Sequence, residues 1–257
     1  MNEIRWWRAV PIALVAGLAV GVLTNLAQGW LPGAWNQIAN SGAVWSVVAF
    51  VAGASVAGRL PRGFTTYGPG VGPSSPAHVR GSFEPVHDAG SGSASSDAGV
   101  ISATELLGLV PPAPSSLPRA LLAGLAAEVG LVVGYYGYAE FGRDGMGDLF
   151  WPTVWVVIAC VAGPVLGVAG LWWRRGVARW QRVAGLAALS GVFGMEAAHY
   201  AFGLGYAPQA WACLAVFLLV PLLASAVREI GLTLLAAVPC AAVAYAVIIL
   251  PLQLLSG

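Results

Sequence analysis

The sequence predicts an all-α fold: a polytopic bundle of about seven transmembrane helices with the N-terminus inside and the C-terminus outside. Three observations predict it. Of 257 residues, 58% are hydrophobic and only 9% are charged, whereas soluble domains carry about 25% charged residues. Apolar runs long enough to cross about 30 Å of hydrocarbon recur along the chain. Arginines gather on one side of those runs, as in inner-membrane proteins.

Seven apolar runs have the length expected of membrane spans: 9–27, 43–58, 119–139, 150–173, 183–203, 208–227 and 230–254. The second is the shortest. The first follows Arg5 and Arg8, as a signal sequence would, but it is too long for a signal peptide, so we expect an uncleaved first helix. Small residues spaced by four predict close helix packing in lipid; they occur at Gly17/Gly21, Gly130/Gly134 and Gly163/Gly167.

The arginines set the predicted orientation. All twelve cationic side chains are arginines. If the seven runs alternate in direction, eleven arginines lie on the side of the N-terminus and only Arg143 lies on the other. Because cytoplasmic loops carry the excess of positive charge, the N-terminus is predicted to be cytoplasmic and the C-terminus external.

We expect three regions along the chain. Residues 1–58 hold the first two helices, joined by an external segment, 28–42, that is either re-entrant or an interfacial helix. Residues 59–118 are rich in Pro, Gly and Ser and predict a disordered cytoplasmic linker. Residues 119–257 supply the other five helices of a single membrane domain.

Three ionisable residues lie well inside the predicted spans: Glu128, Glu196 and His199. An unpaired ionisable group there costs several kcal/mol, so each is expected to face the bundle interior. Glu128, Tyr135 and Tyr136 share one stripe of the third helix, and Glu196 and His199 share one stripe of the fifth. If the stripes face each other, they form a polar pocket open to the outside. Its candidate ligand-binding residues are Glu128, Tyr135, Tyr136, Glu196, His199, Asn25, Asn40 and Ser41.

Three interpretations of this cluster stay open. In the first, Glu196 bonds His199 or a tyrosine, Glu128 is protonated, and the network only fixes helix packing. In the second, the pocket binds a small solute or protons for transport. In the third, the residues catalyse a reaction, but the single Glu-x-x-His is half of a di-metal motif. Ser190 lacks the context of a catalytic nucleophile. We therefore expect no catalytic residues, no metal and no cofactor.

The expected partners are the lipid bilayer and a small-molecule solute, with transporter-type partner subunits left open. A net charge of +1 does not favour nucleic acid. The three cysteines, scattered through apolar runs, predict buried thiols rather than disulfides.

Three segments carry a resemblance: "GVLTNLAQGWLPGAWNQIANSGAVW", "EVGLVVGYYGY" and "GMEAAHYAF". They resemble a domain-of-unknown-function family of small multi-pass integral membrane proteins from high-GC bacteria. The resemblance covers most of the chain apart from 59–118. It implies a bacterial inner-membrane location, no established activity or cofactor, and no catalytic residues to carry over. A more distant likeness is to the membrane-embedded substrate-binding subunits of vitamin transporters, which usually have six spans rather than seven.

Overall fold

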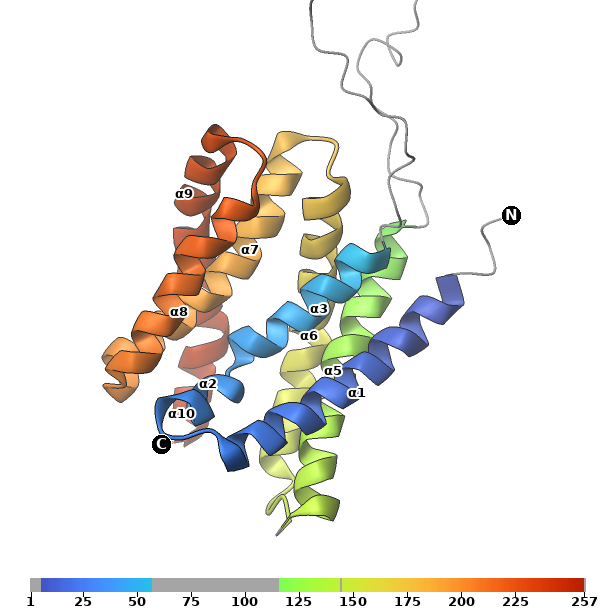
Figure 1. Ribbon diagram of the computed structural model, residues 1–257, viewed down its shortest axis with the longest axis vertical. Coiled ribbons are helices and arrows are strands. Elements are labelled where there is room, and N and C mark those ends of the chain that lie inside the picture. The colour runs from blue at the N-terminus through green and yellow to red at the C-terminus, as the bar shows by residue number, and fades with distance from the viewer. Residues whose placement is uncertain (1–5, 57–115, 144, 257) are drawn as a thin grey trace, which may run out of the picture. The chain divides into compact units, whose positions relative to one another are not determined.

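The computed structural model describes residues 6–56, 116–143 and 145–256, and all regular secondary structure in them is helical (Figure 1). The all-α prediction is confirmed for these residues. The predicted linker, 59–118, lies outside them except for residues 116–118, which form the first turn of a helix.

The described helices follow the predicted runs closely. In chain order they are α1 (Trp6–Trp30), α2 (Ala34–Ala39), α3 (Gly42–Val56), α5 (Ser116–Gly142), α6 (Phe150–Arg175), α7 (Arg179–Ala198), the π-helical η2 (His199–Leu204), α8 (Ala207–Leu219), the 3₁₀ turn η3 (Val220–Leu223), α9 (Val227–Ala244), the π-helical η4 (Tyr245–Ile249) and α10 (Leu250–Ser256). The fifth predicted run thus becomes α7 with η2, the sixth α8 with η3, and the seventh α9 through α10.

Among the described residues, five segments are long and apolar enough to cross a membrane: Arg8–Trp30, Trp35–Val56, Ser116–Gly142, Phe150–Arg175 and Val227–Leu255. The chain is therefore a multi-pass integral membrane protein. The other two predicted spans are helical but weaker. Ala207–Leu223 is apolar but shorter, and α7 begins with two arginines and a glutamine in its first turn.

Most of the segment predicted to be external, 28–42, is helical. The first helix continues to Trp30, and the chain turns at Gly33, whose φ of 53° favours glycine, into the six residues of α2. The Asn36 side-chain amide donates to the backbone oxygen of Gln28 at 2.6 Å, which ties α2 back to α1. Whether this segment lies on the bilayer or enters it stays a prediction.

Glycine lets α1 and α5 approach backbone to backbone. A Cβ atom added at Gly17 or Gly21 would overlap the backbone of α5, and one at Gly130 or Gly134 would overlap the backbone of α1. Both motifs therefore lie on one interface, which is among the most extensive in the structure. This confirms the packing role predicted from their spacing.

The third motif joins α6 to two neighbours. A Cβ at Gly163 would lie 2.7 Å from the backbone oxygen of Gly124 on α5, and Gly167 faces the backbones of both α5 and α3, the latter at Gly53. Helices α3, α5 and α6 thus form one closely packed unit within the bundle. In Figure 1, α7, α8 and α9 lie beside this unit.

An ion pair joins the N-terminal ends of α7 and α9. The guanidinium of Arg182 lies 2.5 Å from a carboxylate oxygen of Glu229, whose side chain is buried in the first turn of α9. A carboxylate in that turn also compensates the positive end of the helix dipole. The two helices therefore begin at the same end of the bundle and run parallel.

Candidate functional site

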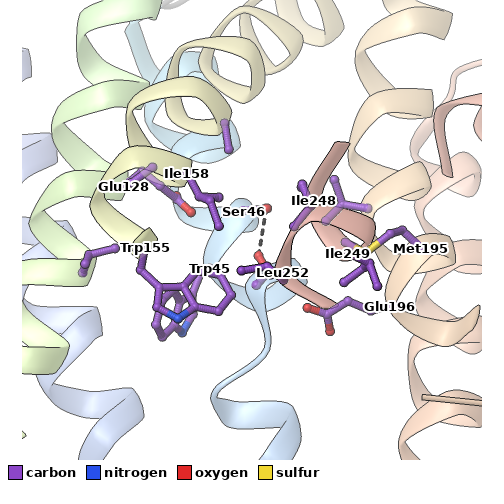
Figure 2. Close-up of a pocket in the computed structure, with 15 residues that line it drawn as sticks. Trp45, Ser46, Glu128, Trp155, Ile158, Met195, Glu196, Ile248, Ile249 and Leu252 are labelled. Atoms are coloured by element: carbon purple, nitrogen blue, oxygen red, sulfur yellow. Dashed lines mark hydrogen bonds between the residues drawn. The ribbon is translucent and has the colours of Figure 1, made fainter. Parts of the chain in front are cut away.

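A cavity of about 50 Å³ lies among α3, α5, α6, α7 and the η4–α10 segment. Most of its wall is apolar, and the side chains in it that carry polar atoms include Trp45, Trp155, Ser46, Glu128 and Glu196 (Figure 2). Since one water needs about 10–15 Å³ of such volume, the cavity has room for a few waters or one small polar group. One glutamate of α5 and one of α7 line it, whereas the other members of the two predicted stripes, Tyr135, Tyr136 and His199, do not.

Glu128 is the unsatisfied member of this pair. Its side chain is only 5% exposed, and its Oε2 atom has no hydrogen-bond partner among the described residues. Its stem is held by close packing, since a Cβ at Gly163 of α6 would lie 3.0 Å from the Glu128 Cβ. A buried polar atom without a partner costs about 1–3 kcal/mol. Glu128 is therefore fixed in place with an unused hydrogen-bonding atom.

Trp45 presents a second unsatisfied group to the same cavity. Its side chain is 3% exposed, and its indole N–H has no hydrogen-bond acceptor among the described residues. The ring is fixed by Trp155, at 5.6 Å between centroids, and by Tyr135, at 5.2 Å. The sequence analysis missed Trp45. Trp45 lies near the edge of the predicted run 43–58, where tryptophans are common, so its position gave no distinguishing signal.

Glu196, in contrast, is fully engaged at the start of α3. Its carboxyl group accepts hydrogen bonds from the Ser41 hydroxyl and from the backbone N–H groups of Gly42 and Ala43, the last at 2.9 Å. The Ser41 oxygen in turn accepts from the N–H of Val44 at 3.2 Å. Backbone N–H groups at a helix N-terminus have no partner within the helix, so these bonds cap α3. Glu196 thus holds α3 against α7.

Tyr135 and Asn25 belong to a different polar cluster, between α1 and α5. The Tyr135 hydroxyl donates to the Gln28 side chain at 2.6 Å, and the Asn25 amide donates to the backbone oxygen of Tyr135 at 3.0 Å. Arg143 donates to the Asn25 side-chain oxygen at 3.0 Å. Tyr136 contacts the ring of Tyr135 at 5.1 Å between centroids. This cluster meets the cavity at the contact between Tyr135 and Trp45.

His199 and Asn40 also lie away from the cavity. His199 is the first residue of η2, and its ring lies near those of Tyr200 and Tyr245, at 6.2 and 6.5 Å between centroids. Asn40 is exposed at the end of α2. Of the eight predicted residues, the structure brings Glu128 and Glu196 to the cavity and places Ser41 against Glu196. The partners of Glu196 are Ser41, the first N–H groups of α3 and, at 4.0 Å, the thiol of Cys213 in α8, instead of His199 or a nearby tyrosine.

The cavity offers oxygen and indole nitrogen atoms, with two carboxyl groups. Within residues 6–56, 116–143 and 145–256, no group of three His, Cys, Asp or Glu side chains is placed to hold a metal ion. The cavity can therefore form hydrogen bonds with a small polar molecule.

Comparison with known proteins gives one match. The model of a family of unknown function, DUF6518, matches residues 2–67 and 91–254. The unmatched interior, 68–90, is shorter than the insertion 59–118 that the resemblance implied. No curated protein and no solved structure matches the chain.

Proposed function

The chain belongs to this family of unknown function, DUF6518. From that premise we propose that the chain binds a small solute at the cavity beside Glu128, and that it transports this solute. One observation carries the proposal: Glu128 and Trp45 both line one cavity, and each holds a buried polar atom without a partner among the described residues. Buried polar groups are nearly always satisfied in folded proteins. A group left without a partner therefore needs an explanation, and a bound ligand is one.

The contrast between the two carboxyl groups supports this assignment. Glu196 bonds Ser41, Gly42 and Ala43 and so has a structural task. The alternative, a membrane protein without a ligand whose polar cluster only fixes packing, accounts well for Glu196. It does not account for Glu128, whose free oxygen adds nothing to helix packing.

We further propose seven membrane crossings in a bacterial cytoplasmic membrane, with the N-terminus inside and a pocket that opens outward. In support, the arginines of the α6–α7 turn and Arg228 share one end of the bundle, since the Arg182–Glu229 pair joins α7 to α9. Arg143 lies at the other end, beyond Gly142 of α5. A phosphatase fused after Gly257 is expected to be active, because that enzyme folds only outside the cytoplasm. An inactive phosphatase with a fluorescent cytoplasmic reporter at the same position refutes this topology.

Cysteine accessibility tests whether a solute reaches the cavity. In a variant whose native cysteines are replaced by alanine, Ser46→Cys places a thiol on the cavity wall. A small thiosulfonate reagent should modify it: the thiolate attacks the sulfur, a mixed disulfide forms and sulfinate leaves. The matched control is Ser190→Cys, because Ser190 is fully buried and bonded to the backbone oxygen of Phe217 at 2.7 Å. If both thiols react equally slowly, solutes do not reach the cavity and the proposal fails.

A stability comparison separates a binding role for Glu128 from a packing role. Glu128→Leu removes a polar group without a partner, so the midpoint of thermal unfolding is expected to hold or rise. A fall as large as that caused by Glu196→Leu assigns both residues to packing. The measurement needs only purified protein in detergent.

A further inference from the structure

The unpartnered polar atoms of Trp45 and Glu128 need different hydrogen-bonding partners. The indole N–H of Trp45 can only donate a hydrogen bond, and Glu128 Oε2 belongs to a carboxyl group that needs a donor when ionised. A hydroxyl group donates and accepts with one atom, so it can serve both. An ammonium group has no lone pair for Trp45. A carboxylate has no proton to donate to Glu128, and the negative charge of a carboxylate or a phosphate is repelled by Glu128 when it is ionised.

The size of the cavity limits how much of the ligand it holds. About 50 Å³ suits a hydroxyl and the carbon that bears it, not a whole molecule of the size of a vitamin. The rest of a larger ligand must therefore lie outside the cavity, along whichever side is open.

One side of the cavity borders lipid-facing surface. Its wall there consists of Ile158 and Ala162 from α6 and Ile248 and Leu252 from η4–α10, all half-buried (Figure 2). In the described residues these two segments share no extended helix–helix interface. Beside these wall residues, Val157 and Val161 of α6 and Val247 of η4 are 60–62% exposed. In a membrane-spanning bundle, exposed valines of this kind contact acyl chains.

We propose that the cavity takes the hydroxyl head of a long-chain alcohol, which enters from the bilayer between α6 and η4–α10 and leaves its alkyl chain among lipids. The hydroxyl donates to Glu128 Oε2 and accepts from the indole N–H of Trp45. This inference rests on the proposed function, since it names the class of solute and its route into the same site.

Photolabelling tests the ligand class without any substitution. The full-length protein, in nanodiscs of zwitterionic phospholipid, is irradiated with a ten-carbon alcohol that carries a diazirine near its hydroxyl. Mass spectrometry then locates the label. We expect label on cavity-wall residues and competition by 1-decanol, but not by decanoate, decylammonium or ethanol at equal concentration. Competition by decylammonium shows that charge selects the ligand, and it refutes the assignment of the ligand as an alcohol. Equal competition by ethanol overturns the lateral route.

Substitutions test the two hydrogen bonds. Glu128→Gln keeps an acceptor and a donor, so labelling should stay within about threefold of wild type. Glu128→Leu and Trp45→Phe each remove one bond and should lower labelling by about fivefold to tenfold. The matched control is Trp173→Phe, because Trp173 packs against Phe50 and does not line the cavity. Loss of labelling in Glu128→Gln as great as in Glu128→Leu refutes the hydroxyl assignment, as does equal labelling in every variant.

These results are separable from those of the proposed function. If Ser46→Cys is modified but 1-decanol does not compete, the cavity binds a solute of another class. If Ser46→Cys is inert and labelling is absent from the cavity wall, both statements fail.

Discussion

The cap that Glu196 places on α3 gives the sharpest prediction, because its hydrogen bonds are explicit. Glu196→Leu keeps the approximate volume and leaves two backbone N–H groups, those of Gly42 and Ala43, without an acceptor. Each buried orphan costs about 1–3 kcal/mol. We therefore expect a loss of about 2–5 kcal/mol in the free energy of unfolding. Glu196→Gln keeps one accepting oxygen and is expected to cost about 1 kcal/mol.

The assay is the midpoint of thermal unfolding of the purified protein in mild detergent. For a folded unit of this size, 1 kcal/mol corresponds to about 2–4 °C, so Glu196→Leu should lower the midpoint by about 4–20 °C. The matched control is Glu140→Leu: Glu140 is exposed, and its carboxylate accepts one exposed backbone bond, from Met146 at 3.0 Å. That variant should shift the midpoint by less than about 3 °C. If Glu196→Leu and Glu140→Leu shift it equally, the capping argument is wrong.

Three further predictions concern packing and polar contacts elsewhere. Gly53→Ala adds a Cβ that overlaps the α6 backbone and should cost about 1–3 kcal/mol, whereas Gly231→Ala, with open space around it, should cost nothing measurable in the same assay. Arg182→Met removes the closer of two arginines from the buried Glu229 and leaves Arg179 at 3.9 Å, so it should destabilise by about 1–3 kcal/mol, less than a fully buried pair because Arg182 is 35% exposed. A double-mutant cycle with Glu229→Met that shows no coupling contradicts the pairing. Tyr135→Phe removes the hydrogen bond from the Tyr135 hydroxyl to Gln28, between α5 and α1, and should lower the free energy of unfolding by about 0.6–1 kcal/mol. An unchanged midpoint of thermal unfolding shows that this bond does not stabilise the fold.

Much of the fold could be predicted because its causes are local. Each apolar run became a helix, and the glycines spaced by four at Gly17/Gly21 and Gly130/Gly134 lie on the α1–α5 interface as their spacing indicated. Small residues and apolar length act through one helix at a time, so a sequence displays them directly.

The faces of the fifth predicted span could not be predicted from a regular helix. Glu196 and His199 are three residues apart and would share a stripe in an α-helix. In the structure the α-helix ends at Ala198 and a π-helix begins at His199, and the two residues have different neighbours. Glu196 then faces α3 while His199 faces Tyr245.

The site itself depends on contacts between distant segments. The unpartnered state of the Trp45 indole is a property of three helices packed together, and no pattern around residue 45 encodes it. The partners of Glu196 are likewise far away in the chain. Sequence patterns identified both glutamates as interior residues but could not assign one to capping and leave the other free.

The distance along the chain between α3 and its cap has a consequence for biosynthesis. Ala43 and Glu196 are 153 residues apart. At about 5–20 residues per second, α3 enters the membrane some 8–30 seconds before the ribosome adds the residue that completes its N-terminus. During that interval the hydroxyl of Ser41, which bonds the N–H of Val44, is the cap that the segment carries with it. The first helices therefore lack the Glu196 cap until α7 has been synthesised. Only then can the contact between α3 and α7 form and join the early and late halves of the chain.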